Sequence, residues 1–96
     1  MSKITVVAKI VAKKDCIEAV KAELFKLIPP TRKENGCIEY NLHQDNQDPS
    51  IFLFYETWES VAAIENHITT DHYKAYAKAL DGILVEKVVN KMTRIG

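Results

Sequence analysis

The sequence predicts a single α+β domain over residues 1–96, in which helices cover one face of a four-stranded antiparallel sheet. Three observations predict this class. The chain is long enough for one small core only. Its composition, 47% hydrophobic and 27% charged, is that of an ordinary globular protein. Its apolar pattern gives the order strand, helix, strand, strand, helix, strand.

The first strand and the first helix lie at the N-terminal end. Residues 4–11 are rich in β-branched side chains, which favour a strand. Asp15 stands three residues before Glu18, a capping-box spacing, and apolar residues follow at helical intervals. Pro29 and Pro30 remove two backbone donors, so we expect this helix to end or kink there.

A hairpin follows in the middle of the chain. Residues 37–44 alternate between apolar and polar side chains, as a half-buried strand does. Residues 45–50 are dense in turn-forming residues, and residues 51–58 form another apolar and aromatic run. The two runs therefore predict adjacent antiparallel strands.

Two short helices and a last strand complete the pattern. Ser60 can cap one helix, Thr69 or Thr70 can cap the next, and Gly82 is a natural stop. Residues 83–92 then form a β-branched strand. This order of elements is that of the ferredoxin-like fold, βαββαβ.

Apolar side chains occur on both faces of the predicted strands. Val7 and Val11 alternate with Val6 and Ile10, yet helices can cover only one face of such a sheet. A monomer of this size also buries only roughly 60–65% of its unfolded surface. We therefore expect a homodimer in which two sheets pack face to face.

Charge, glycine and cysteine content exclude several classes of function. Thirteen basic and thirteen acidic residues give zero net charge, which argues against a nucleic-acid partner. Three scattered glycines cannot build a phosphate-binding loop. No apolar run reaches the length of a membrane span, so we expect no membrane insertion and a cytoplasmic location. Cys16 and Cys37 lack metal or redox spacing and are expected to be buried apolar groups.

Residues 36–40, 49–52, 55–60 and 67–73 resemble the antibiotic biosynthesis monooxygenase (ABM) domain family. The most specific element is Glu-x-Trp-x-Ser at 56–60, followed nine residues after the Trp by a His, then by a second His and an aromatic residue. The resemblance covers nearly the whole chain. It implies a dimeric α/β barrel with a pocket between sheet and helices in each protomer.

The resemblance implies a cofactor-independent monooxygenase that oxidises a small quinol or phenolic aromatic with O2. A deprotonated phenol can give an electron to O2, so no cofactor and no metal are expected, and the protein supplies a base, a hydrogen-bond donor and a dry pocket. Relatives degrade haem or isomerise a small phosphorylated signalling compound, and a non-catalytic ligand-binding dimer is a further alternative. The first strand lacks the Asn of the haem-degrading relatives. An inward-facing Lys9, Arg32 or Lys87 would favour the isomerase.

Two residues are predicted as catalytic. His67 is the candidate base, because imidazole alone has an ordinary pKa near neutrality. Trp58 is either a donor from its indole N–H to a substrate oxygen or a core residue. Tyr73 and Tyr55 are candidate pocket residues, and tyrosines at such spacing are also common in cores. Glu56 lies among aromatic residues. It either orients His67 or polarises the site, or it pairs with a cation or backbone donors across the dimer interface.

Three further polar residues are candidate pocket residues. Asn41 and His43 share the polar face of the second strand and either line the pocket or are solvated. His72 follows His67 by five residues, which is about 140° around an ideal helix. The two histidines are therefore not expected to bind a metal jointly from one helix.

Overall fold

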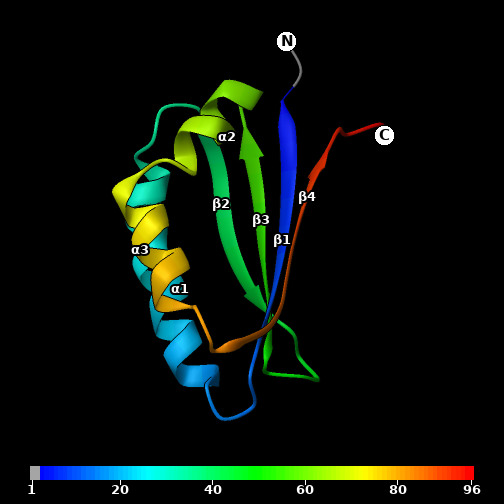
Figure 1. Ribbon diagram of the computed structural model, residues 1–96. Helices are drawn as coiled ribbons and strands as arrows, with labels where there is room; N and C mark the ends of the chain where they lie inside the picture. The colour runs from blue at the N-terminus through cyan, green and yellow to red at the C-terminus, as the bar shows by residue number, and fades with distance from the viewer. Residues whose placement is uncertain (1–2) are drawn as a thin grey trace.

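The computed structural model describes residues 3–96 and has the predicted ferredoxin-like architecture (Figure 1). The strands are β1 (Ile4–Ala12), β2 (Cys37–Gln44), β3 (Ile51–Trp58) and β4 (Leu84–Met92), and they form one antiparallel sheet in the order β2-β3-β1-β4. The helices α1 (Ile17–Arg32), α2 (Val61–His67) and α3 (Asp71–Ala79) lie on one side of the sheet. Among residues 3–96, no helix has both the length and the apolar character needed to cross a bilayer.

Helix α1 continues through its two prolines to Arg32, so of the two expected outcomes, an end or a kink at Pro29 and Pro30, the end is wrong. A proline in a helix frees the carbonyl four residues earlier, here those of Phe25 and Lys26. Both residues are exposed, and water can solvate their carbonyls. The helix also keeps its last turn because Thr31 is buried against the rest of the domain.

The helix caps match the sequence at two of three positions. The side chains of Ser60 and Thr70 accept backbone N–H bonds at the starts of α2 and α3, as predicted. The cap assigned to Asp15 is wrong, because α1 begins after Cys16 and has no side-chain cap. The Asp15 carboxylate instead accepts a bond from the Cys16 thiol.

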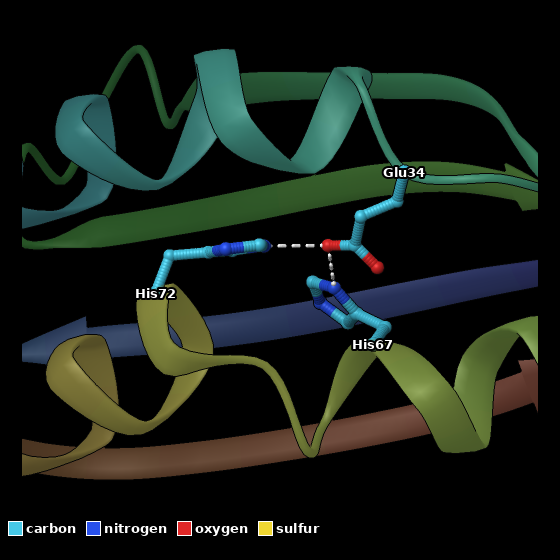
Figure 2. Close-up of side chains that lie close together, drawn as sticks. All are labelled: Glu34, His67 and His72. Carbon is cyan, nitrogen blue, oxygen red and sulfur yellow. Dashed lines mark hydrogen bonds and ion pairs between the residues drawn. The ribbon is translucent and has the colours of Figure 1, made fainter.

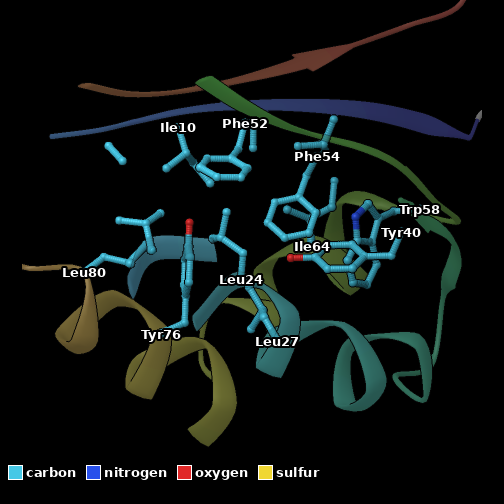
Figure 3. Packing of buried hydrophobic residues seen from close by; sticks show 14 residues of the cluster. Ile10, Leu24, Leu27, Tyr40, Phe52, Phe54, Trp58, Ile64, Tyr76 and Leu80 are labelled. Atoms are coloured by element: carbon cyan, nitrogen blue, oxygen red, sulfur yellow. The ribbon is translucent and has the colours of Figure 1, made fainter. Parts of the chain in front are cut away.

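The core lies between the sheet and the helices (Figure 3). Alternate residues of β1 and β3 point toward the helices, and these buried residues are Val6, Ala8, Ile10 and Ala12 with Phe52, Phe54 and Trp58. Leu24 and Leu27 of α1 and Tyr76 of α3 meet them from the other side. Trp58 has no exposed surface, which makes it part of this core.

The sheet face that carries no helix is partly apolar and open to solvent. On this face Val7 pairs with Tyr55 and Val11 pairs with Ile51 across β1 and β3. Tyr55 is 41% exposed, and Val88 of β4 is 39% exposed. The apolar residues on the second face of the strands are therefore uncovered in the single chain.

A close approach between α2 and the turn before β2 brings distant parts of the sequence together. Gly36 has φ +88°, a left-handed conformation that favours glycine. A Cβ added to Gly36 would lie 2.6 Å from the Cβ of Ala63, so only glycine lets α2 pack this closely. The Gly36 carbonyl also accepts a bond of 2.8 Å from the backbone N–H of Glu59. This contact places Glu34, two residues before the glycine, beside the end of α2.

Candidate active site

A small cavity lies between the sheet and the helices α2 and α3, as expected for the site. Its volume is about 40 Å3. Its polar lining consists of Tyr40, Glu56, His67, Tyr73, Tyr76 and Lys87, and the rest of the lining is apolar. A protein cavity that binds benzene measures about 150 Å3. The cavity therefore has room for O2 or a few water molecules. An aromatic substrate ring can enter only if side chains that line the cavity move.

His67 ends α2 and places its ring in this cavity with only 4% of the residue exposed. The ring lies 4.8 Å from the Trp58 ring and 4.9 Å from the Tyr73 ring, measured between centroids. Burial lowers the pKa of His67, while the hydrogen bond that His67 donates to Glu34 and the negative charge of Glu34 oppose that shift. A histidine with a lowered pKa is neutral at pH 7 and can accept a proton.

Glu34 receives hydrogen bonds from two histidines on different helices (Figure 2). Its Oε2 atom lies 2.7 Å from Nδ1 of His67 and 2.6 Å from Nε2 of His72. The other oxygen, Oε1, is buried and has no hydrogen-bond partner among the described residues. The side chains of Glu34 and His67 are 6% and 5% exposed, whereas that of His72 is 24% exposed.

The convergence of His67 and His72 differs from the sequence expectation. The angle of about 140° applies to one ideal helix. Here α2 ends at His67 and α3 begins at Asp71, so the intervening turn reorients the chain. The nitrogen and oxygen atoms of Glu34, His67 and His72 all lie within 4.8 Å of one another, and these are residue types that bind metal ions. The expectation against joint metal binding from one helix therefore does not apply to this pair, because the two histidines converge from two helices.

Trp58 and Glu56 form a buried pair beside the cavity. The Trp58 indole Nε1–H donates to Glu56 Oε1 at 2.9 Å, so this hydrogen is already used within the protein. Glu56 is 5% exposed. Burial raises its pKa to about 7, with a further rise from the Glu34 charge and an opposing effect of the Trp58 bond. Within residues 3–96 of the single chain, the Glu56 partner is thus Trp58, and neither His67 nor a cation bonds to it.

Tyr73 lines the cavity as predicted, together with one of the three cations named for the isomerase alternative. The Nζ atom of Lys87 donates to the Tyr73 hydroxyl at 3.3 Å and lies 4.7 Å from the centroid of the Tyr76 ring. The other two cations bond elsewhere, Lys9 to Glu86 and Arg32 to the Tyr40 carbonyl. Lys87 is therefore the cation at the cavity.

Four residues named as pocket candidates lie outside this cavity, namely His72, which bonds to Glu34, and Tyr55, Asn41 and His43. Tyr55 is on the sheet face without helices, because it alternates with the buried residues of β3. Asn41 lies on the edge strand β2, and its Oδ1 accepts a bond from Arg32. His43 is exposed on the same strand, and its ring nitrogen is 3.4 Å from the Leu53 carbonyl.

Glu34 is the residue that sequence reasoning missed. It stands two residues before Gly36 in a polar stretch after α1, where nothing in the local pattern distinguishes it from a solvated acid. Its neighbours in space are 33 and 38 residues away in the chain. The close approach that requires Gly36 is the one signal that could have directed attention to it.

The chain is a small ferredoxin-like α+β protein with a cavity between sheet and helices, and His67 lines that cavity. A family model described as antibiotic biosynthesis monooxygenase matches residues 3–79. The chain belongs to this family, and the resemblance noted in the sequence is confirmed. In the structure of PA3566 from Pseudomonas aeruginosa, the same fold recurs with a TM-score of 0.95 at 32% identity, covering 100% of this chain and 97% of that chain.

Relatives by sequence carry different names. Escherichia coli K12 YgiN, named a probable quinol monooxygenase, is 34% identical over 77 residues, which are 72% of this chain and 74% of YgiN. Protein sll1783 of Synechocystis is 30% identical over 96% of this chain, which spans only 63% of that relative. A Salmonella paratyphi B isomerase of (4S)-4-hydroxy-5-phosphonooxypentane-2,3-dione is 35% identical over 52 residues, 54% of each chain.

Proposed function

We propose that this protein is a cofactor-independent monooxygenase that oxidises a small quinol or phenolic aromatic, with His67 as the base. The observation that carries the proposal is the hydrogen bond from His67 Nδ1 to Glu34. A carboxylate accepts only, so Nδ1 carries the proton and the neutral ring keeps a free electron pair on Nε2. The His67 ring lines the cavity, where that pair can take a hydroxyl proton. The likeness to YgiN supports the quinol substrate.

The proposed reaction needs no electrons beyond those of the substrate. His67 removes a proton from a ring hydroxyl, and the electron-rich anion passes one electron to O2. The two radicals combine into a C–O bond, and the peroxide accepts the proton from His67. The ring carbon then loses its C–H proton as the O–O bond breaks, so that one oxygen atom stays on the ring as a hydroxyquinone and the other leaves with that proton as water. The apolar lining excludes bulk water from these charged species.

Substrate entry requires the mouth of the cavity to open. Ile68 and Val89 line the cavity and are 49% and 47% exposed, so they mark its solvent side. Exposed side chains change rotamer on the picosecond to nanosecond timescale. We propose that a quinol ring enters by displacing these two side chains, while O2 fits the cavity as it stands.

The proposed activity is tested by oxygen uptake with substituted hydroquinones and anthrone-like phenols under 18O2. One O2 is expected to be consumed per ring oxidised, with one 18O atom in the product and the other in water. Consumption of O2 with release of hydrogen peroxide and no labelled ring would contradict oxygen insertion. Binding of quinols without O2 consumption would instead favour the alternative of a non-catalytic ligand-binding protein.

A second candidate is an isomerase of a small phosphorylated dione, which one contact favours. Lys87 lines the cavity and gives it a cation that a phosphate group could meet. The 54% overlap with the Salmonella isomerase agrees with this alternative. The haem-degrading alternative is less favoured, because the cavity is far smaller than a haem and β1 lacks the Asn of those relatives.

We further propose that two copies of the chain pack sheet to sheet. The support is the sheet face without helices, where Tyr55 and Val88 are about 40% exposed among other apolar side chains. Burying such a face removes apolar surface from water, which stabilises association by roughly 25 cal/mol per Å2. A second copy offers a face of the same composition, as an isologous dimer requires.

Light scattering at micromolar concentration is expected to give twice the chain mass of 10.9 kDa. Tyr55→Asp would bury an unpaired carboxylate in the interface and raise the dissociation constant by about 10²-fold or more. The matched control is Val61→Asp, because Val61 is an exposed apolar residue on α2 and lies on the helix side. A wild-type monomer, or equal dissociation of both variants, would contradict this interface.

A further inference from the structure

We propose that Glu34 and His72 are positioning residues that fix the proton of His67 on Nδ1 and thereby direct its basic Nε2 atom into the cavity. This inference rests on the proposed function of His67 and adds two residues to it. The three side chains come from the turn before β2, from the end of α2 and from the start of α3.

The geometry of the cluster is that of hydrogen bonds. The two donor nitrogens lie 2.7 and 2.6 Å from a single oxygen, Glu34 Oε2. Charge-assisted N–H bonds to a carboxylate are about 2.7–2.9 Å long. Ligands of a tetrahedral zinc ion, about 2.0–2.1 Å from the metal, would lie roughly 3.3 Å apart. The distances therefore favour a shared proton acceptor over a coordination shell.

The two imidazole N–H groups are the only hydrogen-bond donors that the Glu34 carboxylate meets among the described residues. Its Oε1 atom is buried without a partner, and only 6% of the side chain is exposed. A buried carboxylate with few donors is strongly stabilised by each one it has. Both histidines must then donate to Oε2, which settles which nitrogen of each ring carries the proton.

His72 completes the arrangement from the solvent side. Its side chain is 24% exposed, whereas the side chains of Glu34 and His67 are nearly buried. It holds the carboxylate against the His67 ring without lining the main cavity. Removing its N–H is expected to loosen Glu34 and to leave the substrate contacts unchanged.

The test is the protonation state of each ring nitrogen, measured by long-range 1H–15N NMR on protein labelled in its three histidines. In the wild type we expect His67 protonated on Nδ1 and His72 protonated on Nε2. In Glu34→Leu neither ring keeps an acceptor at the position of Oε2, so His67 is expected to show a mixture of Nδ1 and Nε2 protonation. Glu39→Leu is the matched control, because Glu39 is exposed and bonds to Thr57 on β2 and β3.

Unchanged protonation of both rings in Glu34→Leu would overturn the inference. If that variant does not fold, His72→Leu and His72→Gln form a second pair. The leucine variant loses the donor to Glu34 and is expected to give mixed protonation of His67, whereas the glutamine variant retains an N–H donor and the wild-type state. Equal spectra of His67 in both variants would also contradict the inference.

Activity gives a second readout, which separates this inference from the proposed function. Glu34 lies outside the cavity lining, so Glu34→Leu is expected to lower kcat by about 10²-fold with little change in KM. Loss of the Glu34 charge also lowers the pKa of His67, so the acid limb of the pH–rate profile should move to lower pH. If no quinol is oxidised, the proposed function fails, while the NMR result still decides the positioning role.

Discussion

Replacing His67 by asparagine is expected to lower kcat for quinol oxidation by about 10²–10⁴-fold, the usual contribution of a general base. The asparagine amide can place an N–H near the position of Nδ1, so the hydrogen bond to Glu34 is retained. It has no basic nitrogen at the position of Nε2. The variant therefore removes the base and keeps the contact that holds the end of α2 against the turn before β2. Oxygen uptake with the best hydroquinone measures the effect.

The control for this variant is His43→Asn, because His43 is exposed on β2 and lies outside the cavity. It is expected to leave kcat within about 2-fold of the wild-type value. Since burial lowers the pKa of His67, the wild-type rate should fall only at pH values below the ordinary 6.5. Equal rates in wild type and His67→Asn would show that another group removes the proton.

The fold was predictable from sequence because its determinants are local. β-branched runs, the turn at 45–50 and the caps Ser60 and Thr70 each act within a few residues, and the structure confirms them. The helix through Pro29 and Pro30 was not predictable, since it depends on whether the freed carbonyls face water or the core.

The candidate site was predictable only in part, because its contacts join residues far apart in the chain. His67 and Tyr73 line the cavity, as the spacing of the family motif implied. The same strand alternation that buries Glu56 and Trp58 puts Tyr55 on the opposite face. The hydrogen bond from Trp58 to Glu56 joins two residues on the same face of β3. The alternation of a strand predicts that they share a face, but it does not predict which acceptor the buried indole N–H will bond to.

Glu56 is expected to make the protein less stable as pH rises. Its pKa is raised from 4.5 to about 7 in the folded chain, chiefly by burial. Below pH 4.5 the carboxyl is protonated in both folded and unfolded chains, and it contributes no pH dependence there. Between pH 4.5 and about pH 7 the unfolded chain loses the Glu56 proton and the folded chain keeps it, which favours unfolding. At 1.36 kcal/mol per pKa unit, the loss amounts to about 3 kcal/mol above pH 7.

Glu56→Gln is expected to abolish this loss, because an amide does not ionise and its oxygen can still accept the Trp58 N–H bond. Urea unfolding of both proteins at pH 4.5 and pH 8 measures the effect, at one protein concentration because association also stabilises the folded chain. The variant should gain about 3 kcal/mol relative to wild type between the two pH values. The titration of His67 makes both proteins more stable as pH rises, and this contribution cancels in the difference between them.

Glu65→Gln, on the exposed side of α2, is the matched control and should show no such gain. A constant difference between wild type and Glu56→Gln would mean that Glu56 is already ionised at low pH, held by Trp58 as a carboxylate.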